Sequence, residues 1–249
     1  MFRITLSNAD LLKNSIPIIA EIIDEGVFKV DSNGLSLLSP DRSMIAVVDF
    51  RLLASAFDDF KVTGEETLGL NLSNLVAVIK RIKTGEKVIL SKEDGSNVLE
   101  VVMEGKGRRK FEIPLLNIST EKPPLDQLEF KGKVELDSSI LEEGISDADI
   151  VDDSVVFETN PELFKMWAKG DISSSQLELK KGEEGLSALE APEPVRARYP
   201  LEYLKKMIKA AKFANRVALE FANDYPLRMV FKDIDKINLS FILAPRVEE

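Results

Sequence analysis

The chain has 249 residues, of which 44% are hydrophobic and 31% are charged, so it is long enough to bury one large core or two medium-sized ones. It contains no cysteine and no histidine, which excludes disulfides, thiolate zinc sites and histidine-based catalysis. The formal net charge of −10 argues at first sight against a nucleic-acid partner, because phosphate contacts need clustered lysine and arginine. Charges beyond a Debye length of about 8 Å are largely screened, however, so an acidic protein can still present one basic face to DNA.

The sequence carries no membrane-targeting signal. No window approaches the roughly 18 consecutive apolar residues of a transmembrane helix, and the first five residues do not open a signal-peptide hydrophobic region. We therefore expect a soluble, intracellular protein with no membrane partner.

The first half of the chain predicts the order helix, strands, helix, strands. The first helix is expected over residues 8–23, where Pro17 forces either a bend or a late start. The second is expected over residues 71–82, because apolar residues recur there at helical spacing. Asn33 followed by Gly34 is a strong hairpin signal. The expected strands cover residues 27–31, 35–38, 45–50, 87–91, 97–103 and 108–113.

Between residues 119 and 133 the periodicity fails. Pro123 and Pro124 stand side by side there, and consecutive prolines forbid both helix and ladder hydrogen bonds. We expect this segment to connect two domains, residues 1–118 and residues 134–249.

The pattern restarts after the connector. A helix is expected over residues 138–147, opened by a capping box between Ser139 and Glu142. Another is expected over residues 200–212, with Pro200 in its first turn. The expected strands cover residues 154–159, 163–168, 174–180, 216–221, 227–231 and 237–243.

The two halves correspond at a constant separation of 129 positions. The matching pairs are Leu75 and Leu204, Ile79 and Ile208, Lys80 and Lys209, Val88 and Val217, and Leu90 and Leu219. The shared order of elements on both sides of one connector is the stronger argument, because apolar residues often match by chance. Both observations indicate an internal duplication.

Basic side chains recur on the helices of both halves. In the last helix Leu201, Leu204 and Ile208 form an apolar stripe, while Lys209 and Lys212 fall on a different face. The alternative is an ordinary solvated face. Recurrence in both halves favours electrostatic contacts with a phosphate backbone. The candidates are Lys13, Lys80, Arg81, Lys83, Lys205, Lys206, Lys209 and Lys212.

Two further charged clusters have opposite sign. Arg108, Arg109 and Lys110 stand where a turn enters a strand, and this basic cluster fits a phosphate contact, a subunit contact or a protected sheet edge. The helix over residues 138–147 is acidic and contains no basic residue. Its acidic side chains are Glu142, Glu143 and Asp147. We expect the two clusters to meet in an ionic subunit interface of a head-to-tail assembly, where Arg81 and Lys83 are further partners for the acids.

Paired acids occur at four places and are candidates for a divalent metal site. They are Asp58 and Asp59, Asp147 and Asp149, Asp152 and Asp153, and Asp233 and Asp235. These pairs are scattered through expected turns, and no Walker-type glycine-rich loop accompanies them. We expect no metal, no cofactor and no catalytic residue. A metal-dependent nucleic-acid enzyme and a monomeric two-domain scaffold remain the alternatives.

Several segments resemble archaeal members of the proliferating cell nuclear antigen family of DNA sliding clamps. They are residues 39–43, 203–205, 224–231 and the closing segment 241–249. The resemblance spans the chain and includes its length, the duplication and the proline-bearing connector. It implies an α+β fold with two similar clamp domains per chain, outer antiparallel sheets and inner helices. It also implies a trimeric ring, made of one kind of subunit or of several, around duplex DNA.

The resemblance further implies a non-enzymatic processivity factor on the chromosomal DNA of an archaeal cell. Such a ring binds duplex DNA without sequence specificity and is opened by a clamp loader. It tethers DNA polymerases, ligases and nucleases such as flap endonuclease, which insert a short motif called the PIP box. The matching pocket residues here are Pro40, Met44, Val47, Pro123, Leu125, Pro226, Ile242, Ala244 and Pro245. Ile242 stands where the family often has an aromatic residue, and the acidic helix departs from an evenly basic lumen.

Overall fold

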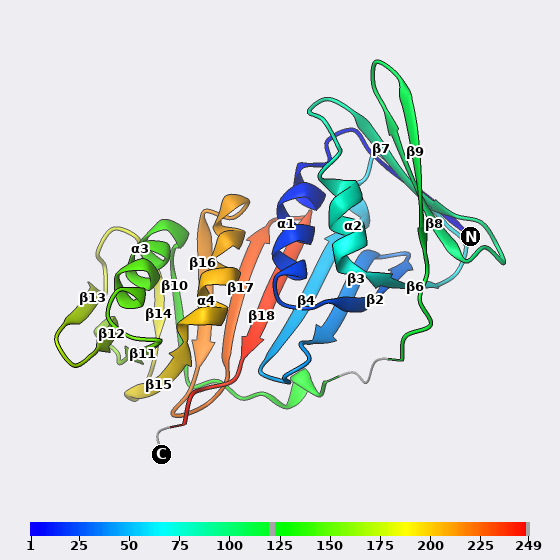
Figure 1. The fold of residues 1–249 in the computed structure, drawn as a ribbon. Coiled ribbons are helices and arrows are strands. Elements are labelled where there is room, and N and C mark those ends of the chain that lie inside the picture. Colours follow the sequence, from blue (N-terminus) through cyan, green and yellow to red (C-terminus); the bar gives the residue numbers. More distant parts are fainter. Residues whose placement is uncertain (120–122, 248–249) are drawn as a thin grey trace. The chain divides into compact units, whose positions relative to one another are not determined.

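A computed structural model of the protein describes residues 1–119 and 123–247, and within these ranges the chain divides into two compact units. The first unit comprises Met1–Arg42, Val48–Pro123 and Asp233–Leu239. The second comprises Ser43–Val47, Pro124–Lys232 and Ser240–Glu249. Figure 1 shows that each unit combines antiparallel strands with a pair of α-helices.

The first unit begins with a strand, and its strands form two hydrogen-bonded sets, which we call rows. Its elements are β1 (Phe2–Leu6), α1 (Asp10–Ala20), β2 (Glu25–Asp31), β3 (Gly34–Pro40), β4 (Ala46–Leu53), the 3-10 turn η1 (Ala54–Ala56), β5 (Asp59–Val62), β6 (Glu66–Asn71), α2 (Leu72–Ile79), β7 (Lys87–Lys92), β8 (Val98–Glu104) and β9 (Arg108–Pro114). The strands lie in the orders β5-β1-β7-β8-β9 and β4-β3-β2-β6.

The second unit follows the same plan. Its elements are the 3-10 turn η2 (Leu125–Gln127), β10 (Gly132–Asp137), α3 (Ser138–Asp149), β11 (Ser154–Thr159), β12 (Leu163–Lys169), β13 (Ser174–Lys180), β14 (Leu186–Glu190), β15 (Val195–Pro200), α4 (Leu201–Met207), the 3-10 helix η3 (Ile208–Lys212), β16 (Arg216–Phe221), β17 (Leu227–Asp233) and β18 (Ile237–Leu243). The strands lie in the orders β14-β10-β16-β17-β18 and β13-β12-β11-β15.

This repetition confirms the duplication. β1 corresponds to β10 and β9 to β18, with the helices at matching places in the order. The strand registers agree as well, because Phe28 opposes Leu37 in the first unit and Phe157 opposes Met166 in the second. Both members of each pair are shifted by the same 129 positions.

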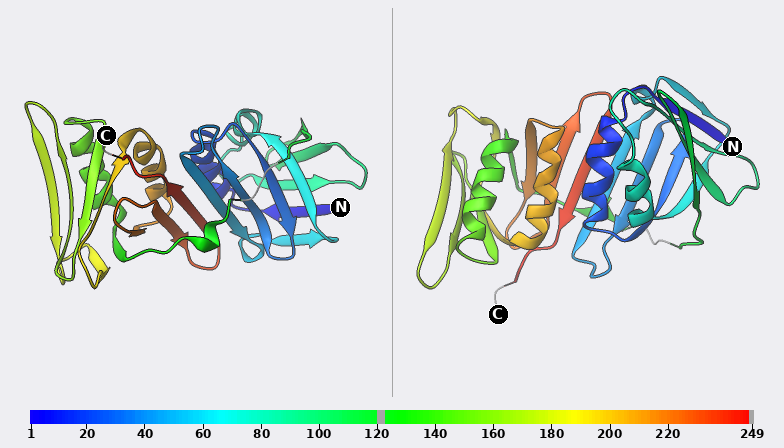
Figure 2. Two further views of the ribbon diagram at one scale, coloured as in Figure 1. Left: turned by 90° about the horizontal axis from the view of Figure 1, so that it is seen from below. Right: turned by 45° about the horizontal axis from the view of Figure 1, so that its top comes forward.

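In each unit the two α-helices lie side by side against one face of the strands, as Figure 2 shows. Side chains along each strand point alternately to the two faces of the sheet, and those on the face toward the helices are the apolar ones. In the second unit the ring of Phe157 lies edge-on to Phe164, Tyr199 and Phe221, with centroids 5.7, 5.4 and 6.2 Å away. All four rings are buried, so this aromatic group forms the centre of that core.

The expected order of elements was wrong, because each unit begins with a strand and six strands were not anticipated. They are β1, β5, β6, β10, β14 and β15. Each has at most seven residues, too few for a periodic pattern to stand out from the flanking loops. β10 begins at Gly132, so the last two residues of the expected connector lie in a strand.

The helix boundaries also differ from those expected. α1 runs only from Asp10 to Ala20 and keeps Pro17 inside it, although proline cannot donate to the preceding turn. Four apolar side chains hold this helix in place through their burial. They are Leu12, Ile16, Ile18 and Ile19.

The expected capping arrangements are wrong for the second-half helices. Asp137 occupies the N-cap of α3, and Ser138 donates its hydroxyl hydrogen bond to the carbonyl of Ala214 at 2.8 Å. The capping box between Ser139 and Glu142 therefore does not form. Pro200 is the N-cap residue of α4 and still belongs to β15, since extended backbone precedes the helix.

Candidate nucleic-acid and partner surfaces

The helix α4 and its continuation η3 separate an apolar face from a basic face. Leu201 and Leu204 are buried against the core, whereas Lys205, Lys209 and Lys212 are exposed. Lys205 lies 2.8 Å from a carboxylate oxygen of Asp149 on α3, which reduces its positive potential. In the described part of the chain Lys212 makes no ion pair.

Lys206 differs from these lysines. Its ammonium is 3.0 Å from Glu202 and 5.2 Å from the ring centroid of Tyr203. The side chain is only 30% exposed. Its contacts therefore tie it to its own helix.

In the first unit the basic candidates follow α2 instead of lying on it. The helix ends at Ile79 and Lys80 is its C-cap, so Arg81 and Lys83 come after the last turn. Cations at a helix C-terminus stabilise the helix dipole, which gives these residues a structural role as well. All three are exposed, whereas Lys13 on α1 is half-buried and 4.0 Å from Asp10.

Two pairs of these lysines occupy equivalent places in the two units. Lys80 and Lys209 are 129 positions apart, and so are Lys83 and Lys212. In the second unit Lys209 and Lys212 line a groove beside the start of α3. Asp137 and Glu142 line the same groove, so this face carries both signs of charge.

The basic cluster Arg108, Arg109 and Lys110 lies on β9, which is an edge strand of its row. Each member already has an acidic neighbour. Arg109 pairs with Glu86 and donates to the carbonyl of Arg81 at 3.0 Å.

The remaining two members pair across or along the strands. Arg108 lies 3.4 Å from Glu104, and Lys110 lies between Glu100 and Glu112 at 2.5 and 2.8 Å. These carboxylates, Glu100 first, raise the pKa of Lys110. The basic cluster is thus neutralised in part within its own unit.

The acidic cluster lies on the exposed surface of α3. Glu142, Glu143 and Asp147 are all exposed, and Glu142 lines the same groove as Lys209 and Lys212. α3 packs against β13, which is an edge strand of the second unit. The basic cluster therefore lies on the edge strand β9, and the acidic cluster lies on a helix that packs against the edge strand β13.

Seven of the nine predicted partner-binding residues belong to the second unit. They are Met44, Val47, Leu125, Pro226, Ile242, Ala244 and Pro245. Pro40 and Pro123 belong to the first unit. The amide of Ala244 donates to the carbonyl of Ile45 at 2.8 Å, which brings the residues around Met44 and Pro245 together.

The predicted partner-binding residues differ in how much of each side chain is exposed. The side chain of Met44 is 72% exposed, on backbone with φ of 56°, whereas Ile242 is only 7% exposed. Ile45, exposed by 37%, was missed at this surface because the sequence pattern assigned it to the start of a strand. On the connector, Phe130 packs edge-on against Tyr225 beside Pro226, with ring centroids 6.0 Å apart.

The scattered acids do not gather into a metal site within residues 1–119 and 123–247. Asp58 accepts from the amide of Ser7, and Asp153 pairs with Arg246. The Arg246 guanidinium holds the pKa of the Asp153 carboxyl below its usual value. None of the helices in those ranges is long and apolar enough to cross a membrane.

Comparisons with known proteins identify the class. The N-terminal domain model of proliferating cell nuclear antigen matches residues 1–122, and the C-terminal domain model matches residues 124–246. The DNA polymerase sliding clamps of Pyrococcus abyssi and Nanoarchaeum equitans are 35% and 33% identical over 248 and 246 residues. Those alignments cover 100% and 98% of this chain and 99% of each relative.

A solved structure agrees with the sequence comparisons. The crystal structure of the proliferating cell nuclear antigen from Thermococcus kodakaraensis superimposes with a TM-score of 0.92 at 27% identity, covering 99% of this chain and 100% of that one. The fold and these matches define a DNA sliding clamp, a processivity factor that is not an enzyme. The chain belongs to the proliferating cell nuclear antigen family. The metal-dependent enzyme considered from the acidic pairs is thereby set aside.

Proposed function

We propose that three copies of this chain close into a ring around duplex DNA, and that the ring holds replication and repair proteins on that DNA in the cytoplasm. The observation that carries the proposal is the pair of open edges, β9 in one unit and β13 in the other. A chain with two different open edges assembles head to tail, and such an assembly must close or grow into fibres. In a ring of identical chains every β9 edge would meet a β13 edge.

Side chains at both edges support this pairing. Phe111 on β9 and Leu177 on β13 are only half-buried on the faces that carry the core residues of their strands. Pairing of the two edges would cover them and add a continuous ladder of backbone hydrogen bonds. Glu142, Glu143 and Asp147 of one copy would meet the basic cluster Arg108, Arg109 and Lys110 of the next. Each such exposed pair contributes about 0–1 kcal/mol.

The DNA contacts would come from the exposed lysines at equivalent places, Lys80 with Lys209 and Lys83 with Lys212, supplemented by the other four basic candidates already described. These residues contact phosphates without reading bases. Because each neutralised phosphate strengthens binding, a face that mixes acids with lysines suits a ring that slides. The ring would stay on the DNA because it encircles the duplex.

Partner proteins would dock on the surface around Met44, Leu125, Ala244 and Pro245. A clamp loader would open the ring, and polymerases, ligases and flap endonucleases would insert PIP-box motifs. The exposed Met44 supports this role, because an apolar side chain in contact with water gains most from being covered. We also retain the domain limits 1–118 and 134–249, with the connector between them.

Retention on circular DNA tests the proposed function. The clamp is loaded onto a nicked plasmid with a loader from a related archaeon, and free protein is removed by gel filtration. The complex is then cut once with a restriction enzyme. We expect the protein to stay on the circle and to leave the linear DNA, because a topological link ends at a free DNA end. Equal retention on both forms would contradict the ring.

A further inference from the structure

One face of the second unit carries a tryptophan among basic side chains. On β12 the buried Phe164 and Met166 face α3, so alternation puts Lys165, Trp167 and Lys169 on the opposite, outward face. Residues directly opposite each other on neighbouring antiparallel strands share a face. The registers therefore add Glu158, Glu178, Lys180, Arg196 and Arg198 to this outward face. We call these eight residues the Trp167 patch.

The charge of the patch is opposite to that of the chain. It has five cationic and two acidic side chains, an excess of three positive charges, whereas the whole chain has a net charge of −10. Such a local reversal of charge attracts an acidic partner.

The centre of the patch is already ordered. The guanidinium carbon of Arg196 lies 5.2 Å from the ring centroid of Trp167, and Arg196 Nε is 3.4 Å from a carboxylate oxygen of Glu158. The half-buried indole covers Val156, which is only 2% exposed. A partner would thus meet side chains whose conformational freedom is already restricted, which lowers the entropy lost on binding.

The duplication shows that the fold does not require this patch. Shifting each register by 129 positions places Leu38 of the first unit at the position of Trp167. In the same way Ser36 replaces Lys165, and Thr67 replaces Arg196. The same sheet therefore forms with neutral residues at these three positions, so the fold itself does not require Lys165, Trp167 or Arg196.

We propose that the Trp167 patch is a docking surface for an acidic segment of a partner protein. Carboxylates of that segment pair with the lysines around the rim, and an apolar side chain covers the exposed part of Trp167. Tryptophan and arginine are the residue types that most often dominate the binding energy of protein interfaces. The proposal depends neither on ring closure nor on the PIP-box surface.

Two features favour a peptide over single-stranded DNA. Arg196 already occupies one face of the indole, which restricts base stacking. Glu158 and Glu178 interrupt the run of cations, so a phosphodiester backbone crossing the sheet would meet negative charge. A peptide can place carboxylates only where the cations lie.

The experiment uses the full chain and a labelled twelve-residue peptide that alternates glutamate with leucine. Trp167 is the only tryptophan in the sequence, so its emission reports directly on the patch. We expect the peptide to shift this emission and to bind less tightly as salt is added. The glutamine-leucine analogue should bind at least about tenfold more weakly, because it lacks the charges.

Substitutions then locate the site. Arg196→Glu combined with Lys165→Glu should weaken binding at least about tenfold by fluorescence anisotropy of the peptide label. Trp167→Phe preserves the packing and should weaken it less. Arg51→Glu, on the outward face of the first unit, is the matched control and should leave affinity unchanged. Circular dichroism shows that each variant is folded.

Four results would overturn the proposal. One is equal affinity for the glutamine analogue. Another is unchanged binding by the folded Arg196→Glu, Lys165→Glu variant. A third is no emission change at millimolar peptide. The fourth is a single-stranded thymidine oligonucleotide that shifts Trp167 emission more strongly than the acidic peptide, which would identify the patch as a nucleic-acid site.

Discussion

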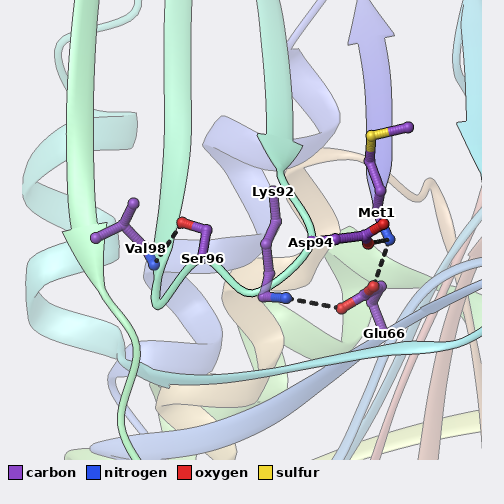
Figure 3. A network of polar contacts seen from close by, with 6 residues as sticks. All are labelled: Met1, Glu66, Lys92, Asp94, Ser96 and Val98. Carbon is purple, nitrogen blue, oxygen red and sulfur yellow. Dashed lines mark hydrogen bonds and ion pairs between the residues drawn. The ribbon is translucent and has the colours of Figure 1, made fainter.

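At the residue scale, the ion network at the start of the first unit links its two rows of strands. Figure 3 shows the amino group of Met1 between Glu66 and Asp94, with Lys92 reaching Glu66 from the other side. The Lys92 ammonium is 2.9 Å from Glu66, and these two side chains are only 13% and 17% exposed. Lys92 belongs to β7 and Glu66 to β6, so the pair joins the five-strand row to the four-strand row.

Glu66→Gln should therefore lower the free energy of unfolding by about 1 kcal/mol at neutral pH. The hydrogen bond from the Met1 amino group, followed by that from Lys92, lowers the pKa of Glu66. Its contribution is thus present above the pKa of the unfolded chain and is lost as the pH falls through the folded pKa. Denaturant titrations at pH 7 and pH 3 measure this difference.

Glu65→Gln is the control for this prediction. Glu65 is its neighbour but is 57% exposed and pairs with Lys29 on the surface. Its substitution should change stability less at either pH. An equal loss in both variants, or a loss from Glu66→Gln that persists at pH 3, would refute the role assigned to Glu66.

Gly69 on β6 allows a close approach between two backbone segments. The amide of Leu116 donates to the Gly69 carbonyl at 2.8 Å, and an added Cβ on Gly69 would lie 2.1 Å from the Leu116 carbonyl oxygen. Gly69→Ala should destabilise the protein by about 1–3 kcal/mol, because the backbone of Leu116 cannot move aside as easily as a flexible side chain could.

Thermal unfolding checks this prediction against Gly107→Ala. An added Cβ on Gly107 meets no atom within 4 Å, so that variant should unfold at nearly the native temperature. Equal melting temperatures for the two variants would mean that the segment around Leu116 can move away at little cost.

At the element scale, the strand edges decide how the ring should be tested. Arg109→Glu would bring a second acid beside Glu86, its partner within the chain, so a loss of assembly could reflect local damage. Leu177→Asp on β13 avoids that problem. We expect it to weaken assembly by at least about 2 kcal/mol, or roughly 30-fold, through loss of an apolar contact.

Glu143→Arg should weaken assembly far less, by about 0–1 kcal/mol, and mainly at low salt. Sedimentation equilibrium of both variants over a range of concentrations gives the comparison with the native chain. A native trimer that resists Leu177→Asp would show that β13 is not at the interface. A larger loss from Glu143→Arg than from Leu177→Asp would show that ionic contacts dominate.

A separate prediction concerns the proposed partner-binding surface. Leu125→Asp combined with Ala244→Asp should weaken binding of a synthetic PIP-box peptide by about 2 kcal/mol or more, because its aromatic anchor loses an apolar site. Isothermal titration calorimetry measures the affinity. Ile242 is too buried for the same test, since Ile242→Asp would disturb the core. Unchanged affinity in the double variant would remove this surface from the proposed function.

At the scale of the whole molecule, the chain has a net charge of −10, and the proposed DNA contacts rest on a few lysines that the duplication repeats at one place in each unit. Lys80→Glu with Lys209→Glu should reduce clamp-dependent polymerase processivity, with the largest loss at low salt, where the missing phosphate contacts contribute most. Lys232→Glu, an exposed lysine on β17, serves as the control for charge reversal. Normal processivity of the folded, assembled double variant at every salt concentration would exclude these lysines from DNA contact.

The sequence by itself determined the features that depend on neighbours along the chain. The hairpin at Asn33 and Gly34, the basic face of α4 and the separation of 129 positions follow from local periodicity and turn chemistry. The family was then indicated by the resemblance of the closing segment together with residues 39–43, 203–205 and 224–231, because these are continuous stretches of specific residues.

Only the tertiary structure decided which residues meet across strands. Short strands such as β5 and β14 form because longer neighbouring strands provide backbone hydrogen-bond partners. The residues of these short strands do not by themselves predict a strand. The pairing of Arg109 with Glu86 depends on the same long-range register. The contact between Trp167 and Arg196 depends on this register too. These residues are 29 positions apart in the sequence, yet the guanidinium carbon of Arg196 lies 5.2 Å from the ring centroid of Trp167, because the packing of a whole sheet sets the strand register.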